Sequence, residues 1–359
     1  MKNRVQKNLM IVIVVVLAVA LAACGGNSAP AQSEQGASSS ANTSAGSGSS
    51  GQKGNGEPEI SVRVAFGPGK GSLPYDTVVI FKEKVEERSN GRIEIKMFPD
   101  SQLGSDSAVL DALKLGTIEM TLLSTALASK VPEFGVFDIP FLFADRSKVE
   151  RIAHGEVWEQ DLKGKLPAQG LVGLGFWEAG FRQITNNVRP INEPADLKGL
   201  KIRVPESQVR MAMFSHFGAN PVPMDFGELF SGLHQGVVDG QEGPLSNTQS
   251  AKLDEVQKYL SITNHNYSPA YLLASKKWFD TLSPEDQQLL TDAAQEAGDE
   301  IRDRAENLDK ELIEYFKEKG MEVNTANIVA FQAEIGPVTD LVKEQIDPAF
   351  VDKVIEHAK

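Results

Sequence analysis

The 359-residue sequence contains a single cysteine, Cys24, so no disulfide bond can form within the chain. Its five histidines are scattered, and neither an H-E-x-x-H pair nor a C-x-x-C pair is present, which removes the common zinc and redox motifs. The chain also lacks a G-x-S-x-G nucleophile elbow. We therefore expect no catalytic residues, no cofactor and no metal site.

Basic residues are scarce as well. The 36 lysines and arginines face 49 acidic residues, which gives a net charge of −13 at neutral pH. Such an acidic chain is a poor partner for nucleic acid. A small anion is not excluded, because charges beyond the Debye length of about 8 Å are screened and local arginines decide its binding.

The N-terminus combines basic residues with a short apolar run. Lys2, Arg4 and Lys7 precede the run from Leu9 to Ala20, and small residues then lead to Cys24. This pattern predicts a signal peptide at residues 1–23, whose removal takes away three basic residues and no acidic one and leaves a net charge of −16. The L-A-A-C ending resembles a bacterial lipobox, so we expect Cys24 to be lipid-modified.

A low-complexity segment follows. Residues 25–58 contain 8 glycines, 9 serines and 5 alanines, a composition that cannot form a packed core. We interpret residues 24–58 as a lipidated cysteine and a disordered tether, with a reach on the order of 30 Å. The protein is then anchored on the outer face of the cell membrane without spanning it.

The remaining 300 or so residues exceed one ordinary core and suggest two lobes. Strands are predicted at 60–66, 92–98 and 117–124. One helix is predicted between the first two strands, at about 75–89, and a second helix, which ends at Leu115, precedes the third strand. This gives the order β-α-β-α-β. Four residues recur at a constant offset of 120: Leu113, Gly116, Ile118 and Glu119 match Leu233, Gly236, Val238 and Asp239. Two similarly built lobes would leave such a repeat. Further strands are predicted at 170–178 and 180–185.

The segment from Lys198 to Leu245 carries the main candidate for binding. Apolar and basic residues alternate up to Arg203, and Pro205 ends this strand just before a predicted helix from about Gln208 to Phe217. Arg203 is therefore expected at the carboxyl end of a strand beside a helix N-terminus. Ligands bind at that edge of open α/β sheets, where a carboxylate meets free N–H groups and a positive dipole end.

Several ordered segments resemble a known family. The runs DLKGLKIRVPES and FGANPVPMDFGELFSGLHQGVVDGQE, together with VPEFGVFDIPFLF, GFWEAGFRQITNNVRPI and NYSPAYLLASKKWFDTLSPEDQ, are similar to the solute-binding proteins of TRAP transporters, the DctP family. The resemblance implies an α/β, two-lobed periplasmic-binding-protein-like fold with a hinge and a long helix spanning both lobes. We place lobe 1 at 59–179 plus 269–308 and lobe 2 at 180–268 plus 309–359. Nothing breaks the helical pattern between Ser283 and Gly320.

The resemblance also implies site residues. Arg203 matches the family arginine that holds the solute carboxylate through two parallel N–H···O bonds, and Arg182 matches a second arginine of the site. Two arginines suit a dicarboxylate or a carboxylate flanked by hydroxyls. Phe226 matches a ring beside the solute, and Gly243 replaces an asparagine that several family members carry after DGQE.

Two further residues, Trp177 and Ser124, are candidates for the site. Trp177 lies five residues before Arg182 and is interpreted as a pocket wall or as core filler, and core packing is also open for Phe226. Ser124 ends a predicted strand and offers a hydroxyl to the solute.

The sequence therefore predicts an extracytoplasmic lipoprotein that captures a small organic acid, with a C4-dicarboxylate among the candidates, for the membrane subunits of a TRAP-type permease. Two other interpretations stay open. The chain could serve an ABC importer or a signalling receptor, which would keep the lobes and change the partner. It could also be a surface lyase acting on an acidic substrate, because distant residues can assemble a site.

Overall fold

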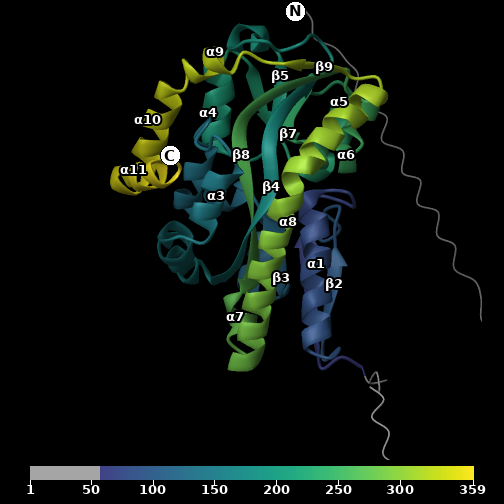
Figure 1. Cartoon of the computed structure of the whole chain (residues 1–359), viewed down its shortest axis with the longest axis vertical. Coiled ribbons are helices and arrows are strands. Elements are labelled where there is room, and N and C mark those ends of the chain that lie inside the picture. The colour runs from purple at the N-terminus through teal and green to yellow at the C-terminus, as the bar shows by residue number, and fades with distance from the viewer. Residues whose placement is uncertain (1–56) are drawn as a thin grey trace, which may run out of the picture. The chain divides into compact units, whose positions relative to one another are not determined.

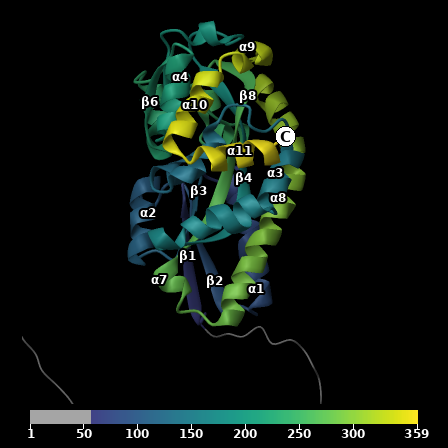
Figure 2. The same cartoon turned by 90° about the vertical axis from the view of Figure 1, so that its left-hand side faces the viewer.

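A computed structural model describes residues 57–359. The predicted signal peptide, Cys24 and all but the last two positions of the predicted tether lie outside the described residues. All nine described strands belong to one mixed sheet in the order β2-β1-β3-β8-β4-β7-β5-β6, with β9 paired to β8. Helices lie on both sides of the sheet (Figure 1; Figure 2). The predicted α/β class is confirmed.

Two lobes occupy opposite ends of this sheet (Figure 1). Lobe 1 contains β1 (Ile60–Phe66), α1 (Leu73–Arg88), β2 (Ile93–Phe98), α2 (Asp106–Leu115) and β3 (Met120–Leu123). Lobe 2 contains β5 (Lys201–Val204), α4 (Gln208–His216), β6 (Asn220–Pro223), α5 (Leu229–His234), β7 (Gly240–Pro244) and α6 (Leu245–Ser250). In each lobe the first strand pairs in parallel with the other two, so the predicted β-α-β-α-β order occurs twice.

The repeat at an offset of 120 residues has a structural counterpart. Gly116 and Gly236 follow α2 and α5 with φ angles of +76° and +71°, a left-handed conformation that glycine adopts without strain. Beyond them, Glu119 accepts a hydrogen bond from the backbone N–H of Arg63 at 3.0 Å, and Asp239 accepts one from Lys201 at 2.8 Å. Each acid therefore fixes the neighbouring strand at the same point of its lobe.

The lobes are joined by two long antiparallel strands, β4 (Leu171–Asn186) and β8 (Tyr259–Ser275). Two strands were predicted at 170–178 and 180–185, whereas β4 is one strand of 16 residues. Its pairing with β8 shifts register three times, including between Glu178 and Gly180, and Gly180 has a φ of +117°. Such bulges bend a strand without ending it, which is why the glycine does not interrupt the ladder.

One arginine holds the region of this bulge. Arg146 begins α3 (Arg146–Ala153) and donates from Nε to Glu178 Oε1 at 2.7 Å and from Nη2 to Asp309 Oδ2 at 2.6 Å. Its guanidinium also lies 5.3 Å from the centre of the Phe181 ring. Arg146 thus connects α3 to the crossing strand and to the long helix.

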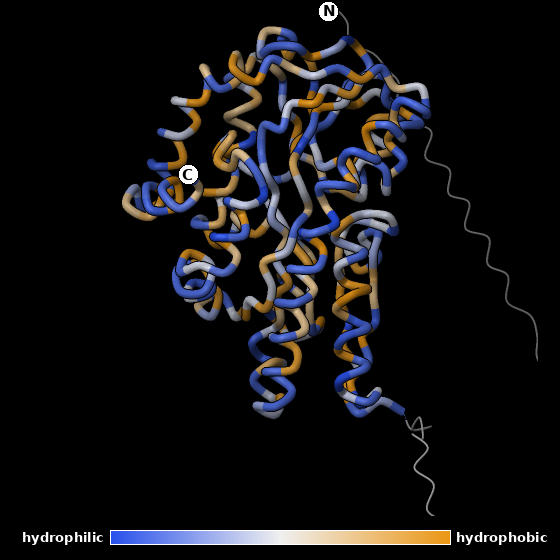
Figure 3. The backbone as a smooth tube through the Cα atoms, in the orientation of Figure 1, coloured by the Kyte–Doolittle hydropathy of each residue, from blue (hydrophilic) through white to orange (hydrophobic). Residues whose placement is uncertain are grey.

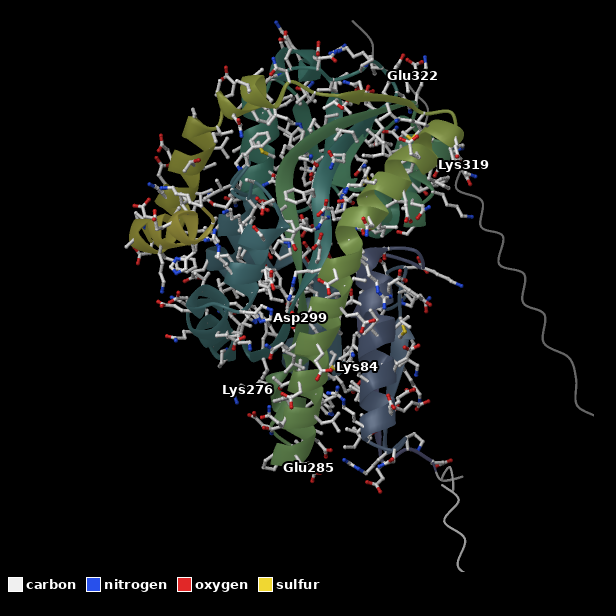
Figure 4. The ribbon with its side chains drawn as sticks, in the orientation of Figure 1. Lys84, Lys276, Glu285, Asp299, Lys319 and Glu322 are labelled. Carbon is white, nitrogen blue, oxygen red and sulfur yellow. The ribbon has the colours of Figure 1, made fainter. Side chains whose placement is uncertain are left out.

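That helix, α8 (Pro284–Glu318), has 35 residues and runs along both lobes, as predicted. At 1.5 Å per residue it is about 52 Å long. The side chain of Ser283 caps its first turn by accepting from the N–H of Asp286 at 3.1 Å, and Pro284 occupies the first position. Glu285 and Lys319 mark its opposite ends in Figure 4.

The helix is held by a narrow apolar stripe. Its buried residues recur every three or four positions through Leu290, Ala294, Ala297 and Ile301, the period of one helix face. Hydrophobic and hydrophilic residues accordingly alternate along α8 and α1 (Figure 3). Short chains at this stripe allow the helix to lie close to β4.

A short helix, α7 (Lys276–Phe279), precedes α8. After α8 the chain ends in one strand and three short helices: β9 (Glu322–Thr325), α9 (Ile328–Gln332), α10 (Gly336–Gln345) and α11 (Pro348–His357). Pro337 and Pro348 lie in the first turns of α10 and α11. From the sequence, the tail at residues 328–357 is predicted to form helices kinked at these two prolines; that prediction is wrong, since each proline begins a helix. Helix α10 packs on α4 and α11 on α3, so this tail touches both sides of the predicted lobe boundary, which stays a prediction. In the described part of the chain, no helix has the length and apolar character needed to cross a membrane.

Candidate functional site

A cavity of about 80 Å³ lies between the lobes, several times the space of about 10 to 15 Å³ that one water molecule needs. Lobe 1 contributes the loop after β1, the start of α2 and the end of β3, whereas lobe 2 contributes the carboxyl ends of β5 and β7. Its lining includes Gly67, Asp106, Ser124, Arg182, Arg203, Phe226, Gln241, Gly243, Asn247 and Thr248. Five of the six predicted ligand-binding residues are therefore brought together.

Arg203 lies at the end of β5, where Pro205 ends the strand as predicted. Its Nε donates to the Met224 carbonyl at 2.8 Å, whereas its two terminal nitrogens form no hydrogen bond with any residue between 57 and 359. Within residues 57–359 no carboxylate forms an ion pair with it, although the residue is only 4% exposed. Burial lowers the pKa of Arg203 to about 10, so the side chain stays a cation at neutral pH.

Arg182 lies in β4 and is engaged by the protein itself. Its Nε and Nη2 both bond the Glu242 carboxylate, Nη2 also donates to the Glu242 carbonyl at 2.7 Å, and Nη1 donates to Ser268 Oγ at 3.1 Å. A guanidinium has five N–H groups, so four hydrogen bonds leave one for a solute. The expected second fork for a carboxylate is therefore reduced to a single donor.

Glu242 is the centre of a buried network that sequence reasoning did not identify. Besides Arg182, its carboxylate accepts from Arg210 Nη1 at 3.1 Å and contacts His265 Nε2 at 3.2 Å. Burial raises the pKa of the Glu242 carboxyl, but the charges of Arg182 and Arg210 outweigh that effect and hold the pKa below its usual range. Burial also lowers the pKa of His265. Glu242 therefore stays ionised and compensates Arg182.

Arg210 connects this network to the other lobe. From α4 in lobe 2, its Nη2 lies 2.7 Å from Oδ1 of Asp138, which ends the 3-10 helix Pro132–Asp138, a segment that the predicted boundary assigns to lobe 1. Ser207 Oγ donates to the other oxygen of the same carboxylate at 2.6 Å. A further contact joins the lobes nearer the surface, where Ser107 Oγ donates to Glu206 Oε2 at 3.0 Å. None of the residues in these contacts lines the cavity, so the contacts lie beside it and not within it.

Asp106 faces the cavity from lobe 1, at the first position of α2. It is half-buried, and its carboxylate forms no hydrogen bond or ion pair with any residue between 57 and 359. Burial raises its pKa to about 6, Asp225 and Glu206 add to this effect, and Arg203 opposes it. No sequence motif marked this residue, because its position opposite Arg203 depends on how the lobes meet.

The other predicted residues contribute shape more than charge. Phe226 follows β6, and a Cβ added to Gly67 of the other lobe would lie 3.6 Å from its ring. Ser124 Oγ donates to the Pro269 carbonyl at 2.6 Å, so it offers a solute an acceptor and not the expected donor. A Cβ on Gly243 would lie 2.8 Å from Gln241 Oε1. The glycine therefore leaves space that an asparagine would fill.

Trp177 does not line the cavity, so its interpretation as a pocket wall is wrong. Its side chain is fully buried in lobe 1, where the ring lies 5.9 Å from that of Phe81 and Nε1 donates to the Ala294 carbonyl of α8 at 2.6 Å. A Cβ on Gly298 would come within 2.6 Å of the indole. The long helix covers this face of β4, so Trp177 belongs to the core.

The site is suited to binding. It offers the guanidinium of Arg203, which has no ion-pair partner among residues 57–359, and that of Arg182, which is paired with Glu242. Several hydrogen-bonding groups surround the same cavity of about 80 Å³. Across residues 57–359, no group of three or more histidine, cysteine, aspartate or glutamate side chains has an arrangement that could hold a metal ion.

Comparisons with known proteins agree with this geometry. A family described as bacterial extracellular solute-binding protein, family 7, matches residues 67–345. The 2,3-diketo-L-gulonate-binding periplasmic protein of Escherichia coli is 43% identical over 246 residues, 68% of this chain and 75% of that protein. The sugar acid binding protein of Advenella mimigardefordensis, solved with galactonate, has a TM-score of 0.81 and 37% identity over 84% of this chain and 98% of that one. A TRAP periplasmic solute binding protein of Sulfurospirillum deleyianum, solved with succinate, has a TM-score of 0.78 and 33% identity over 83% and 98%.

Proposed function

The chain belongs to family 7 of the bacterial extracellular solute-binding proteins, the DctP family, and from this membership we propose that it captures a small organic acid for a TRAP-type permease. The relatives named above bind a diketo sugar acid, a sugar acid and a dicarboxylate. Carboxylate capture is their shared chemistry. The family consists of binding proteins, and we assign this chain no catalytic step.

The observation that supports the proposal most directly is the unpaired guanidinium of Arg203 in a cavity between two lobes. Its Nε is fixed by the Met224 carbonyl at 2.8 Å, which orients the plane of the fork. A carboxylate can then accept two parallel N–H bonds from the terminal nitrogens, a geometry that lysine does not provide. Arg182 adds its one remaining N–H from β4, which is separated from β5 by β7.

Closure of the lobes follows from the same contacts. An open cleft admits the solvated acid, and approach of the lobes forms the Asp138–Arg210 pair while water leaves the site. Opposite charges attract more strongly in such a low-dielectric setting. We infer that the solute favours the closed form because it contacts both lobes only there. The bulge at Gly180 in β4 is the place where the crossing strands can bend.

The location proposed for the protein is outside the cytoplasm, on a lipid anchor at Cys24. The lipobox-like ending and the tether of residues 24–58 support this part of the proposal. A tether on the order of 30 Å leaves the lobes free to reach membrane subunits of the permease.

A binding screen tests the proposed function. Organic acids of several classes are first added to the purified protein, and the thermal unfolding of each mixture is measured. The acids that stabilise the protein are then titrated by calorimetry. A solute at 100 times its dissociation constant adds about 2.7 kcal/mol to the free energy of unfolding. Arg203→Lys should weaken binding of any stabilising acid by about tenfold or more, because a point charge replaces the fork.

Arg151→Lys is the matched control, since Arg151 is an exposed arginine of α3 and does not line the cavity. Its affinity should equal that of the unmodified protein. If Arg203→Lys also binds with unchanged affinity, Arg203 does not hold the carboxylate. If no organic acid binds, the proposed function is wrong.

A further inference from the structure

The cavity wall carries hydrogen-bond acceptors that have no donor from the protein. The Asp106 carboxylate forms no bond with any described residue, and Asn247 Oδ1 is buried without a partner. Both residues line the cavity, Asp106 from lobe 1 and Asn247 from lobe 2. A buried acceptor without a donor is unfavourable, as for Asn247 Oδ1, and the half-buried Asp106 carboxylate is open to a donor from the cavity. The missing donors are therefore expected to come from the solute.

Gln241 supplies a third acceptor, and its orientation is fixed by its neighbours. Its Nε2 lies 3.2 Å from Thr185 Oγ1 and 3.4 Å from Thr248 Oγ1. Thr185 already donates to Gln257 Oε1, and Thr248 already donates to the Pro244 carbonyl, both at 3.0 Å. Each hydroxyl has one hydrogen, so both must accept from Gln241. The amide oxygen then points away from them, toward the space left by Gly243.

The charged residues of the cavity wall differ in whether another residue of the protein pairs with them. Four charged residues line the cavity, and two of them, Arg182 and Glu242, are paired with each other. Arg203 is left to meet an anion, whereas Asp106 is left to meet a hydrogen-bond donor. A second carboxylate on the solute would find only the one remaining N–H of Arg182 and would lie near a carboxylate and two amide oxygens. Like charges placed together in a closed interface disfavour binding.

We propose that the solute is a polyhydroxy monocarboxylate, whose carboxylate binds Arg203 while its hydroxyls donate to Asp106, Gln241 and Asn247, and that Asp106 excludes acids with a second carboxylate. This inference rests on the proposed function and narrows its substrate class. Hydroxyls suit this wall because each can donate to one acceptor, and the three acceptors lie on different elements.

The assignment also gives Asp106 a part in closure. Arg203 belongs to lobe 2 and Asp106 to lobe 1, so an acid without hydroxyls can occupy the arginine while leaving lobe 1 without a hydrogen bond. A hydroxylated acid contacts both lobes at once. It therefore stabilises the closed form, whereas the bare acid does so only weakly.

Calorimetric titration of the full chain with matched acids tests the inference. D-galactonate, D-galactarate and hexanoate share a six-carbon chain and differ in the second carboxylate or in the hydroxyls. D-erythronate, tartrate, succinate and butyrate repeat the comparison with four carbons, and serine represents the zwitterionic alternative, in which an ammonium group meets Asp106. We expect a hydroxylated monocarboxylate to bind at least about 100-fold more tightly than its diacid or its deoxy counterpart, a difference of about 2.7 kcal/mol.

The variant Asp106→Asn keeps an acceptor oxygen and removes the charge. It should reduce the preference for the monocarboxylate over the diacid of equal length by about tenfold or more. Asp111→Asn is the control, because Asp111 is an exposed acid on the same helix and does not line the cavity. Thermal unfolding of both variants checks that they are folded.

The outcomes separate the two proposals. Binding of a diacid or of a deoxy acid as tightly as the hydroxylated monocarboxylate overturns this inference and leaves carboxylate capture standing. Tightest binding of serine, or an unchanged preference in Asp106→Asn, overturns it as well. Failure of every acid to bind overturns the proposed function, and this inference with it.

Discussion

Arg210 of α4 and Asp138, which the predicted boundary assigns to the other lobe, meet 2.7 Å apart, with both side chains buried. The same guanidinium reaches Glu242 at 3.1 Å, and Glu242 compensates Arg182 at the cavity wall. The contact between the lobes and the binding site are therefore parts of one chain of charged groups. A change at the contact should be felt by the solute although neither residue carries an expected solute contact.

Asp138→Ala should weaken solute binding. Removal of one partner of a buried ion pair costs about 3 to 5 kcal/mol, and this cost falls mainly on the closed form, where Arg210 is enclosed. We expect the dissociation constant measured by calorimetry to rise by about tenfold or more. Ser107→Ala removes an exposed hydrogen bond between the lobes and should change affinity by only about threefold. Equal effects of the two variants would show that the buried pair has no special part in closure.

Stability should depend on pH through Asp106. Its pKa in the folded protein is raised to about 6, mainly by burial and then by Asp225 and Glu206 against the opposing charge of Arg203. The folded protein therefore binds this proton more tightly than the unfolded chain does. The resulting stabilisation is complete below about pH 4 and is lost as the pH rises through 6, a difference on the order of 1 to 3 kcal/mol.

Denaturant unfolding of the unmodified protein and of Asp106→Asn between pH 4 and 7 measures this effect, because the difference between their free energies isolates the one group. The variant should be relatively more stable at pH 7 than at pH 4. A difference that does not vary with pH would mean that Asp106 titrates normally.

Gly243→Asn should restrict the cavity. A Cβ at this position lies 2.8 Å from Gln241 Oε1 and 3.8 Å from Arg182 Nη2, so the added side chain displaces the amide oxygen or occupies its space. Affinity for a six-carbon acid should fall by about tenfold or more, and a four-carbon acid should lose less. Gly236→Asn is a suitable control, since nothing lies within 4 Å of a Cβ there and asparagine tolerates a positive φ. Tighter binding of the larger acid by Gly243→Asn would contradict the assigned role.

Trp177→Phe should distinguish a role of Trp177 in the core from a role in the cavity wall. The substitution leaves the Ala294 carbonyl without its 2.6 Å hydrogen bond from Nε1, which costs about 1 to 3 kcal/mol in a buried setting. The free energy of unfolding should fall by that amount, whereas the affinity of the folded protein should remain within about twofold, since Trp177 does not line the cavity. A large loss of affinity at unchanged stability would return Trp177 to the cavity wall.

Much of the fold was accessible to sequence reasoning because it depends on local signals. The Ser283–Pro284 helix start, the glycine at 116 and the Pro205 strand end are all read within a few residues. The single strand β4 was missed because Gly180 is tolerated there only through a bulge with β8, and bulges depend on the partner strand. Pro337 and Pro348 show the same limit, since a proline begins a helix as readily as it ends one.

The site divides in the same way. Arg203 follows from the strand pattern and from the family resemblance, and the structure places it at the cavity. Which carboxylate compensates Arg182 depends on the pairing of β4 with β7, and the place of Asp106 depends on the meeting of two lobes. The indole of Trp177 is enclosed because α8 presents Gly298 to it, 121 positions later in the chain. These relations join distant residues, so no local pattern encodes them.

Arg146 fixes the strand residue just before the Gly180 bulge and a residue of the long helix with one guanidinium. Because Arg146 links β4 to α8 beside the bulge, a hinge motion of the lobes there has to bend the strand and the helix together. We therefore expect Arg146 to limit how far the two lobes open when no solute is bound. The extent of opening is then controlled by a residue that lies away from those that bind the solute.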